Sequence, residues 1–455
     1  MSDFISLYTA FSGLTAAQAG INTTSHNIAN AATPGFTRQR VDLTSRMPYH
    51  QRFGLTGQGV DVQQISRVRV AGLDTQVRTS ASAQGRLEVL SNLLAGTEAL
   101  MGEPNEGITA GMGGLWAAFD ELTLDPPNSA ARRNVISALE SLTTNIRNVA
   151  QKWELEAHSA SNLLSDYAGE TNSMLHEVAE LNRLILSTSQ DNGLPNDLLD
   201  QRDVLLDELA NIAGVTVTTM DNGAARVSLD GLSLVSDTVV SPLAYDPATH
   251  NISHSSGAQV AVGGELAGFQ SYLQNELPDF QSKLNTFVAD LADALNAQHA
   301  IGFAPDGSAG VPLLSYTAGS EARSLTVVVT DPSQIAAAGS GPPVAEYDGV
   351  NAEALSALRH SLAAEGGTAN LDDSIRSLVS YVGELTSAAT YGAESQNAMT
   401  AAAENARMQT HGVSIDEEMV NLITYQRAYE AAARVMTAVD ESLDTLINRT
   451  GVVGR

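Results

Sequence analysis

A long helical seam occupies the C-terminal end of the chain, between residues 413 and 449. Its apolar residues recur in alternating steps of three and four, which is the spacing of a coiled coil. Ser414 and Glu417 form a capping box at its start, and Gly451 is placed to end the helix. A helix of roughly 35 residues is about 50 Å long, so an apolar seam of that length requires a partner helix. The predicted seam comprises Leu422, Tyr425, Tyr429, Ala432, Met436, Val439, Leu443 and Leu446.

The N-terminal end of the chain carries a matching pattern. Large apolar residues recur at every seventh position, at Leu7, Leu14, Ile21 and Ile28. This helix is expected to end before Pro34, because proline disfavours helix at the residue that precedes it. Two independent core helices would explain the spacing equally well, but not its location at both extreme ends. We therefore predict that the two ends pair and that their seam residues form an assembly interface.

The composition excludes several classes of protein. The chain has 455 residues, enough for two to four domains, with 24 basic and 52 acidic residues and a net charge of −28. Such a charge argues against wrapping nucleic acid or an anionic membrane surface. There is no cysteine, so a disulfide framework and a thiol nucleophile are excluded. Hydrophobic residues make up 43% but aromatic residues only 5%, which favours thin helical packing over a bulky core.

The interior of the chain switches between helical and extended patterns. A helical region begins at residues 87–101, and after Pro127 the seam spacing predicts a helix of some 60 residues, about 90 Å long if continuous. From Val215 the pattern alternates as in strands, and Asp221-Asn222-Gly223 is a strong hairpin signal. Helix returns at Leu266, with a kink expected at Pro278, and a last interior helix begins near Asn370.

These patterns predict a mainly α fold with nested, discontinuous domains. Residues 1–40 and 413–455 form a terminal coiled-coil domain, 41–213 and 266–412 a helical rod bundle of long helices, and 214–265 a small β insertion domain.

A locally basic zone follows the N-terminal helix. Between residues 36 and 86, eight arginines face only three aspartates, although the protein as a whole is strongly acidic. Solvated arginines and a patch that meets an acidic neighbour are both open interpretations. The second interpretation predicts that arginines 38, 40, 67 and 69 contact acidic surface on neighbouring subunits.

No pattern in the sequence indicates catalysis. Phosphate-binding loops, zinc-protease motifs and nucleophile elbows do not occur. His250 and His254 are four residues apart but lie in a turn-rich stretch without a third ligand, and the acidic turn at residues 191–200 misses calcium-loop spacing. The acidic residues 416–418 are ascribed to helix capping. We predict that the protein is not an enzyme and has no catalytic residue, metal site or cofactor.

Three motifs carry a resemblance to a known family. The stretch SHNIANAATPGF, residues 25–36, resembles the signature of bacterial flagellar axial proteins, and VSIDEEMVNL (413–422) with YQRAY (425–429) is similar to their other terminus. The interior stretches NDLLDQRD (196–203) and NAQH (296–299) are similar to the flagellar hook-associated protein 1 family, which forms the first hook–filament junction. The signature residues are Asn27, Ala29, Asn30, Thr33, Pro34, Gly35 and Phe36.

The resemblance implies a structural subunit of a ring homo-oligomer that joins hook to filament and is needed for filament assembly and motility. Its implied partners are the hook protein, the second hook–filament junction protein and an export chaperone at the C-terminal helix. Its implied location is the extracellular flagellum, reached by type III flagellar export. The N-terminal stretch also lacks the pattern of a cleaved signal peptide, and no apolar run is long enough to span a bilayer. The alternatives are a hook or rod subunit or, in a different class, a secreted adhesin or enzyme.

Overall fold

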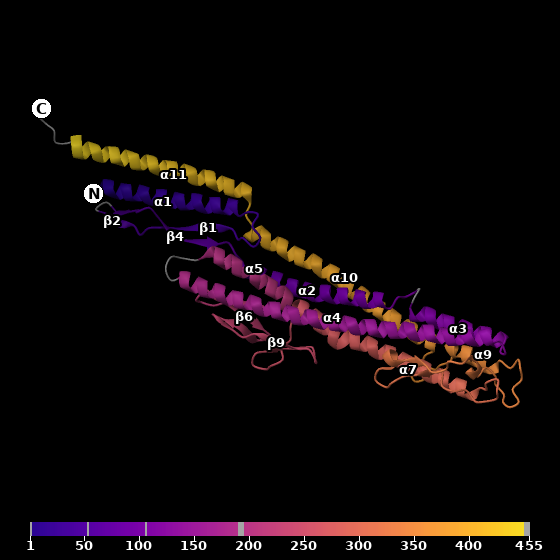
Figure 1. Cartoon of the computed structure of the whole chain (residues 1–455). Helices are drawn as coiled ribbons and strands as arrows, with labels where there is room; N and C mark the ends of the chain where they lie inside the picture. The colour runs from indigo at the N-terminus through magenta and orange to yellow at the C-terminus, as the bar shows by residue number, and fades with distance from the viewer. Residues whose placement is uncertain (1, 52–53, 105–106, 190–194, 450–455) are drawn as a thin grey trace.

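The computed structural model describes residues 2–51, 54–104, 107–189 and 195–449 and shows an elongated, mainly helical molecule (Figure 1). The mainly α fold class predicted from the sequence is confirmed. The α-helices are α1 (Ser2–Ala29), α2 (Ala71–Leu100), α3 (Ile108–Leu124), α4 (Ser129–Ser189), α5 (Asn196–Ala213), α6 (Gly264–Ser271), α7 (Leu277–Ile301), α8 (Glu321–Ser324), α9 (Val350–Ala357), α10 (Leu371–His411) and α11 (Ile415–Asp444). The strands are β1 (Gln39–Ser45), β2 (Tyr49–Gln51), β3 (Gly54–Thr56), β4 (Val60–Arg67), β5 (Thr216–Thr219), β6 (Ala225–Leu229), β7 (Leu232–Ser236), β8 (Val239–Val240), β9 (Leu243–Asp246), β10 (Asn251–His254), β11 (Leu314–Ser315) and β12 (Thr326–Val327).

The two ends of the chain lie together, as their sequence patterns predict. Helix α11 runs beside α1, and strands β1–β4 form an antiparallel ribbon on the other side of α1 (Figure 1). Ser414 caps α11 by accepting the backbone N–H of Glu417 at 3.5 Å, while the predicted stop at Gly451 lies outside the described residues. We call residues 2–70 and 412–449 the terminal unit, strands β1–β4 the ribbon, and residues 71–411 the rod.

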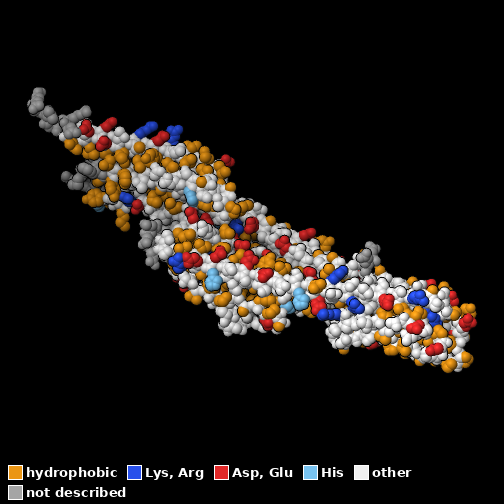
Figure 2. Space-filling view, viewed as in Figure 1, with side chains coloured by type: hydrophobic (Ala, Val, Ile, Leu, Met, Phe, Trp, Pro, Cys, Tyr) orange, Lys and Arg blue, Asp and Glu red, His pale blue; other side chains and the backbone are white. Residues whose placement is uncertain are grey.

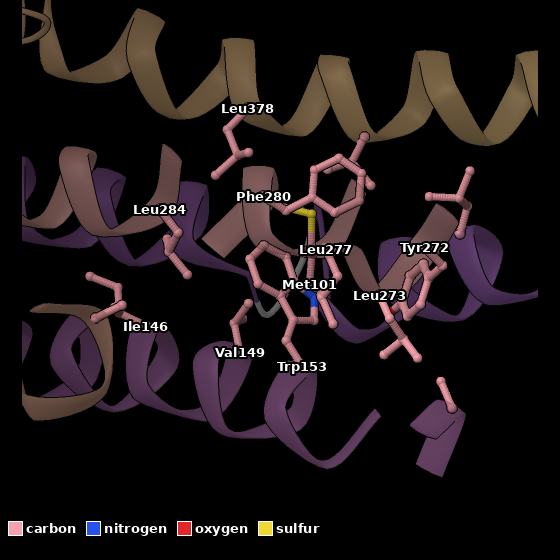
Figure 3. Packing of buried hydrophobic residues seen from close by; sticks show 14 of the residues in the cluster. Met101, Ile146, Val149, Trp153, Tyr272, Leu273, Leu277, Phe280, Leu284 and Leu378 are labelled. Atoms are coloured by element: carbon pink, nitrogen blue, oxygen red, sulfur yellow. The ribbon is translucent and has the colours of Figure 1, made fainter. Parts of the chain in front are cut away.

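The rod is organised around one continuous helix of 61 residues, α4, which confirms the long helix predicted from the seam spacing. Helices α2, α3, α5 and α7 pack along it, and α10 packs on α2 and α7 (Figure 1). Figure 3 shows the middle of the resulting core, where Trp153 of α4 lies beside Phe280 of α7 with ring centroids 6.2 Å apart. The Trp153 indole N–H donates to the carbonyl of Thr97 at 3.2 Å, so its polar atom is paired although the side chain is fully buried. Among the described residues, this core cluster runs from Leu90 to Ala389 and takes no member from the terminal unit.

Helix α2 begins at Ala71, 16 residues before the expected start of the first interior helix at Leu87. Its first half is poor in apolar residues, so the sequence gives little helical periodicity there. Tertiary contacts stabilise it instead, because Val77 is buried and Gly85 lies against α5. A Cβ at Gly85 would stand 2.7 Å from the carbonyl oxygen of Asn211, so only glycine permits this close packing.

A small β region interrupts the helices between α5 and α6. The hairpin predicted at residues 221–223 is present, with Thr219 opposite Ala225 in strands β5 and β6. Strands β5 to β8 form a four-stranded sheet in sequence order, and β9 and β10 form a separate pair. Near the kink expected at Pro278, the helix contains a π-turn over Tyr272–Glu276 between α6 and α7.

The π-turn yields a testable stability prediction. Tyr272 is fully buried, its hydroxyl bonds to the Thr97 hydroxyl at 2.7 Å, and burial raises its pKa to about 12. Replacing Tyr272 with Phe is expected to lower the free energy of unfolding by about 1 kcal/mol, because one buried hydrogen bond is lost while the ring still fills its space. Denaturant unfolding measures the change, and Tyr391→Phe, at an exposed tyrosine, is the control. Equal midpoints for the two variants would contradict the prediction.

Candidate functional site at the joint between terminal unit and rod

The terminal unit meets the rod at a compact polar region that we call the joint. It is built from the end of α1, the base of the ribbon, the starts of α2 and α5, and the short connection between α10 and α11 (Figure 1). These pieces are far apart in sequence, so the side-chain contacts that join them determine how the terminal unit is held on the rod.

Asn27 ties the signature motif to both chain ends. Its side chain is 1% exposed. The amide group donates to the Gln39 carbonyl at 2.8 Å and to the Glu418 carboxylate at 3.1 Å, and its oxygen accepts the Gln39 N–H at 3.0 Å. A side chain with both donors and an acceptor is needed here, so asparagine at this position is explained by hydrogen bonding.

Glu418 is a buried ion-pair residue, which corrects its assignment to helix capping alone. It accepts from the Arg38 guanidinium at 2.8 Å, and Arg38 also reaches Glu417 at 2.9 Å. The Glu418 side chain is 3% exposed, against 63% for Glu417. Asp416 and Glu417 therefore remain exposed first-turn carboxylates, whereas Glu418 is buried against Asn27 and Arg38.

A dense, largely buried ionic cluster lies on the rod side of the joint. On the surface of the middle part of the molecule, acidic side chains are visible (Figure 2). Asp203 of α5 accepts from Arg67 at 2.7 Å and from Arg69, and Arg78 lies 3.5 Å away. Arg67 also donates to Asp200 at 2.7 Å. Burial alone would raise the pKa of Asp203, but the charges of Arg69 and Arg67 outweigh burial and lower it.

The same cluster extends to α2 and α10. Arg69 donates to Asp74 at 2.6 Å, and Asp207 accepts from Arg78 at 2.7 Å and from Arg407 at 2.5 Å. Four arginines and four aspartates from the ribbon, α2, α5 and α10 thus compensate one another. The expectation that Arg67 and Arg69 meet neighbouring subunits is wrong for these two residues, because their acidic partners lie in the same chain.

Three further arginines of the basic zone form separate ion pairs outside this cluster. Arg38 pairs within the terminal unit, as described, and Arg40 forms an exposed pair with Asp42 at 2.9 Å. Arg46 pairs with Asp61 at 3.2 Å and lies over the Tyr8 ring. Exposed pairs of this kind contribute little to stability.

The interior motif at residues 196–203 faces in two directions. Toward the terminal unit, Asp200 accepts the Thr37 N–H at 3.0 Å, and the Asn196 amide donates to the Ile65 carbonyl at 2.9 Å. Toward the small β region, Arg202 donates to Asn182 at 3.0 Å and to the carbonyl of hairpin residue Gly223 at 2.8 Å. Burial lowers the pKa of Arg202 to about 10. The motif therefore fixes both the ribbon and the β region relative to α5.

The second interior motif holds the distal loops on α7. The Asn296 amide donates to the Leu314 carbonyl at 2.9 Å and accepts the Leu313 N–H at 2.7 Å. His299 is fully buried, with Nδ1 donating to the Val311 carbonyl at 2.6 Å and Nε2 accepting the Ala336 N–H at 2.8 Å. This motif is a structural clamp outside the joint.

The predicted seam residues lie along the contact between α1 and α11. Leu446 is exposed, and the other members are half-buried: Leu7, Leu14, Ile21, Ile28, Leu422, Tyr425, Tyr429, Met436, Val439 and Leu443. Two helices therefore cover the seam only in part. Its role in assembly stays a prediction.

The other signature residues form the turn after α1. Asn30 and Phe36 are half-buried, whereas Ala29, Thr33, Pro34 and Gly35 are exposed. Two features favour glycine at position 35. Its φ of +76° is one that other residues rarely adopt, and a Cβ there would stand 2.2 Å from the Val204 side chain. This turn borders a cleft of about 770 Å³ between α1, α4 and α5.

His250 and His254 do not form a shared site. His250 bonds to the Tyr245 hydroxyl and His254 to the Ser256 hydroxyl, each at 2.8 Å. Within the described ranges, no group of three or more histidines or carboxylates is arranged to hold a metal ion. In the same part of the chain, no helix has the length and apolarity that crossing a membrane requires.

His411 links the end of α10 to the start of α2 and predicts a pH effect. Its Nε2 accepts the Val70 N–H at 2.9 Å, and its Nδ1 lies 3.8 Å from Asp74. Burial lowers its pKa below 6.5; Asp74 opposes this, and Arg69, Arg407 and Arg67 add to it. The neutral form is favoured in the fold, so its stabilisation is complete above pH 6.5 and is lost as pH falls through the lower folded pKa.

Melting temperatures recorded between about pH 7.5 and 5.5 check this effect. His411→Gln, which keeps an acceptor without titrating, is expected to lose less stability on acidification than the natural chain. His176→Gln, at an exposed histidine, serves as the control and is expected to behave like the natural chain. Parallel curves for the His411 variant and the natural chain would refute the prediction.

Known protein families match both ends and the interior of the chain. Residues 94–314 match the model of the flagellar hook-associated protein FlgK helical domain. Residues 7–37 match flagella basal body rod proteins, and residues 404–449 match the flagellar basal body rod FlgEFG protein C-terminal region. The matches to the two paired ends and to the helical rod are therefore all to flagellar proteins.

Full-length relatives narrow the class. Flagellar hook-associated protein 1 of Bacillus subtilis (strain 168) is 28% identical over 515 aligned residues, which cover 100% of both chains. The Escherichia coli (strain K12) protein of the same name is 24% identical and covers 96% of this chain and 98% of its own length. The flagellar hook junction protein FlgK from Burkholderia pseudomallei has the same fold, with a TM-score of 0.67, 17% identity, and coverage of 75% of this chain and 100% of its own. Over its whole length the chain is similar to proteins named flagellar hook-associated protein 1.

Proposed function

We propose that this chain is a structural subunit of the bacterial flagellum that forms the junction ring between hook and filament. The observation that carries the proposal is the end-to-end match to hook-associated protein 1 relatives. The fold supports it, because the terminal unit leaves a partly covered apolar seam while the rod has its own core. The proposed role is therefore structural and not catalytic.

The proposed partners follow from the same role. They are further copies of the chain in a ring, the hook protein on one side, and the second hook–filament junction protein on the other. A flagellar export chaperone is proposed to bind the apolar face of α11 before assembly. The proposed location is the extracellular flagellum, reached by flagellar type III export.

We also propose a three-part organisation for these roles. The terminal part, expected at 1–40 and 413–455, assembles; the rod, 41–213 and 266–412, spaces the ends; and 214–265 forms the β part. Because β1 begins at Gln39 and pairs with β4 as far as Arg67, a boundary near residue 70 keeps the ribbon whole.

A hook or rod subunit is the second candidate within the same class. The rod-protein matches at both ends favour it, whereas the interior match over residues 94–314 favours the junction protein. Electron microscopy of flagella from a deletion strain separates the two. Intact hooks without filaments, restored by the natural chain, are expected for a junction subunit, while loss of the hooks would identify a hook or rod subunit.

A further inference from the structure

Helices α1 and α11 lie side by side (Figure 1) and meet in three layers that repeat every seven residues. The facing pairs are Gly13 with Ala432, Gly20 with Tyr425, and Asn27 with Glu418. The residue numbers rise along α1 while they fall along α11, so the two helices are antiparallel. On α1, each layer residue directly precedes one of the large apolar residues of the predicted seam. Small and polar residues of α1 therefore form the centre of this contact.

The first two layers differ in how much space they leave. A Cβ added at Gly13 would stand 3.8 Å from the Cβ of Ala432, which is an ordinary contact distance. A Cβ added at Gly20 would stand only 2.5 to 2.6 Å from three atoms of the Tyr425 ring. The ring therefore occupies the space that any side chain at position 20 would need, and glycine permits this close approach.

The third layer is polar and buried. The exposed fraction is 1% for Asn27 and 2% for Glu418, and the amide donates to the carboxylate at 3.1 Å. Arg38 also donates to this carboxylate, at 2.8 Å. A buried carboxylate is tolerated only where its partners are present, so this layer strongly disfavours other arrangements of the two helices. A single buried polar layer in a coiled coil is a known means of specifying register.

A shift by one heptad would preserve the apolar spacing but would break the layers. Such a shift moves α11 along α1 by about 10 Å. In one direction Tyr425 would face Asn27, where no glycine leaves room for its ring. In the other direction Glu418 would face Gly20 and would be separated from both Asn27 and Arg38.

We infer that Gly20, Asn27, Tyr425 and Glu418 are positioning residues that fix the register in which α11 packs on α1. The inference goes beyond the proposed function and does not depend on it. Its consequence for assembly is direct. Two helices cover the seam only in part, so their register determines which seam atoms remain uncovered.

Disulfide formation tests the register directly, because the natural chain contains no cysteine. In the in-register pair, Gly13→Cys/Ala432→Cys, the 3.8 Å between the two Cβ positions is the ordinary separation in a disulfide. In the shifted pair, Gly13→Cys/Val439→Cys, the second cysteine lies about 10 Å farther along α11, beyond the reach of a disulfide. Dilute, purified full-length chain is oxidised with diamide, and the loss of two thiols from the monomer is measured. The in-register pair is expected to oxidise, whereas the shifted pair is not.

A steric exchange tests the glycine layer. Adding Gly20→Ala to the in-register pair is expected to abolish its disulfide, because the new methyl group needs the space of the Tyr425 ring. Adding Gly20→Ala together with Tyr425→Ala is expected to restore the disulfide. Gly72→Ala is the matched control, because Gly72 is exposed on α2 and an added Cβ has no neighbour within 4 Å. An unchanged disulfide in the Gly20→Ala chain would overturn the inference.

Removing two layers together tests what else could set the register. With Tyr425→Ala/Glu418→Leu present, the shifted pair is expected to oxidise. If only the in-register pair still oxidises, the short connection at residues 412–414 sets the register and the inference is wrong. Oxidation of the shifted pair in the otherwise natural chain would refute it as well. If neither pair oxidises in this variant, the exchange at Gly20 and Tyr425 decides the matter.

Discussion

Placing aspartate at both Met436 and Leu443 is expected to abolish filament attachment while leaving the melting of the rod unchanged. Both residues are half-buried on the side of α11 that faces α1. Each carboxylate would enter an apolar contact without a partner, at a cost of several kcal/mol. The rod is expected to be spared because the core cluster of the described residues lies between Leu90 and Ala389.

Motility is measured in a deletion strain that expresses the variant. Chaperone affinity and thermal melting are measured on the purified variant. Chaperone binding is also expected to weaken if the chaperone grips the same side of α11. The control Thr424→Asp/Ala428→Asp adds the same charge at exposed positions of the helix. A large fall in the melting temperature of the rod would show that α11 is an ordinary core helix.

Removing the Asp203 carboxylate is expected to destabilise the rod by about 3 kcal/mol, near the lower end of the range for breaking a buried ion pair. Asp203 is 14% exposed and lies among Arg67, Arg69 and Arg78. Each arginine keeps a second carboxylate, which limits the loss. Because the pKa of Asp203 is lowered in the fold, its stabilisation is complete above the ordinary pKa of about 3.9 and is lost as pH falls through the folded value.

Denaturant unfolding of Asp203→Ala at neutral pH measures the effect. Glu180→Ala is the matched control, because Glu180 forms a pair with Arg183 in which both side chains are more than half exposed. No measurable change is expected for the control. If both variants unfold at the same denaturant concentration, the ionic cluster does not stabilise the joint.

Most of the architecture follows from periodicity. The 4-3 spacing predicts α4 and α11, and the Asp-Asn-Gly signal predicts the β5–β6 hairpin, because these features depend on residues close in sequence. The pairing of the ends was inferred from two apolar seams at opposite ends of the chain, each of which requires a partner. Periodicity does not predict the first half of α2, because this segment has few apolar residues. It is helical because Gly85 and Val77 pack against distant segments.

The joint shows the same limit more sharply. Asp200, Asp203 and Asp207 are spaced three and four apart, so the sequence does place them on one face of a helix. That acidic face is the one signal that could have located the partner of Arg67 and Arg69. Ion pairs between residues more than 100 positions apart depend on the tertiary fold. The sequence alone therefore does not show whether the acidic partner belongs to the same chain or to a neighbouring subunit.

The nested order of the chain also sets the order in which its parts can form. Helix α1 is the first element of the described residues and α11 their last α-helix, so the terminal unit cannot close until both segments are available. Closing a loop of that length is entropically costly for a free chain, but a rod already folded brings both ends to the joint. A polypeptide truncated before α11 would therefore fold its rod and still lack the paired helices. The terminal unit can therefore form completely only in a chain that includes α11.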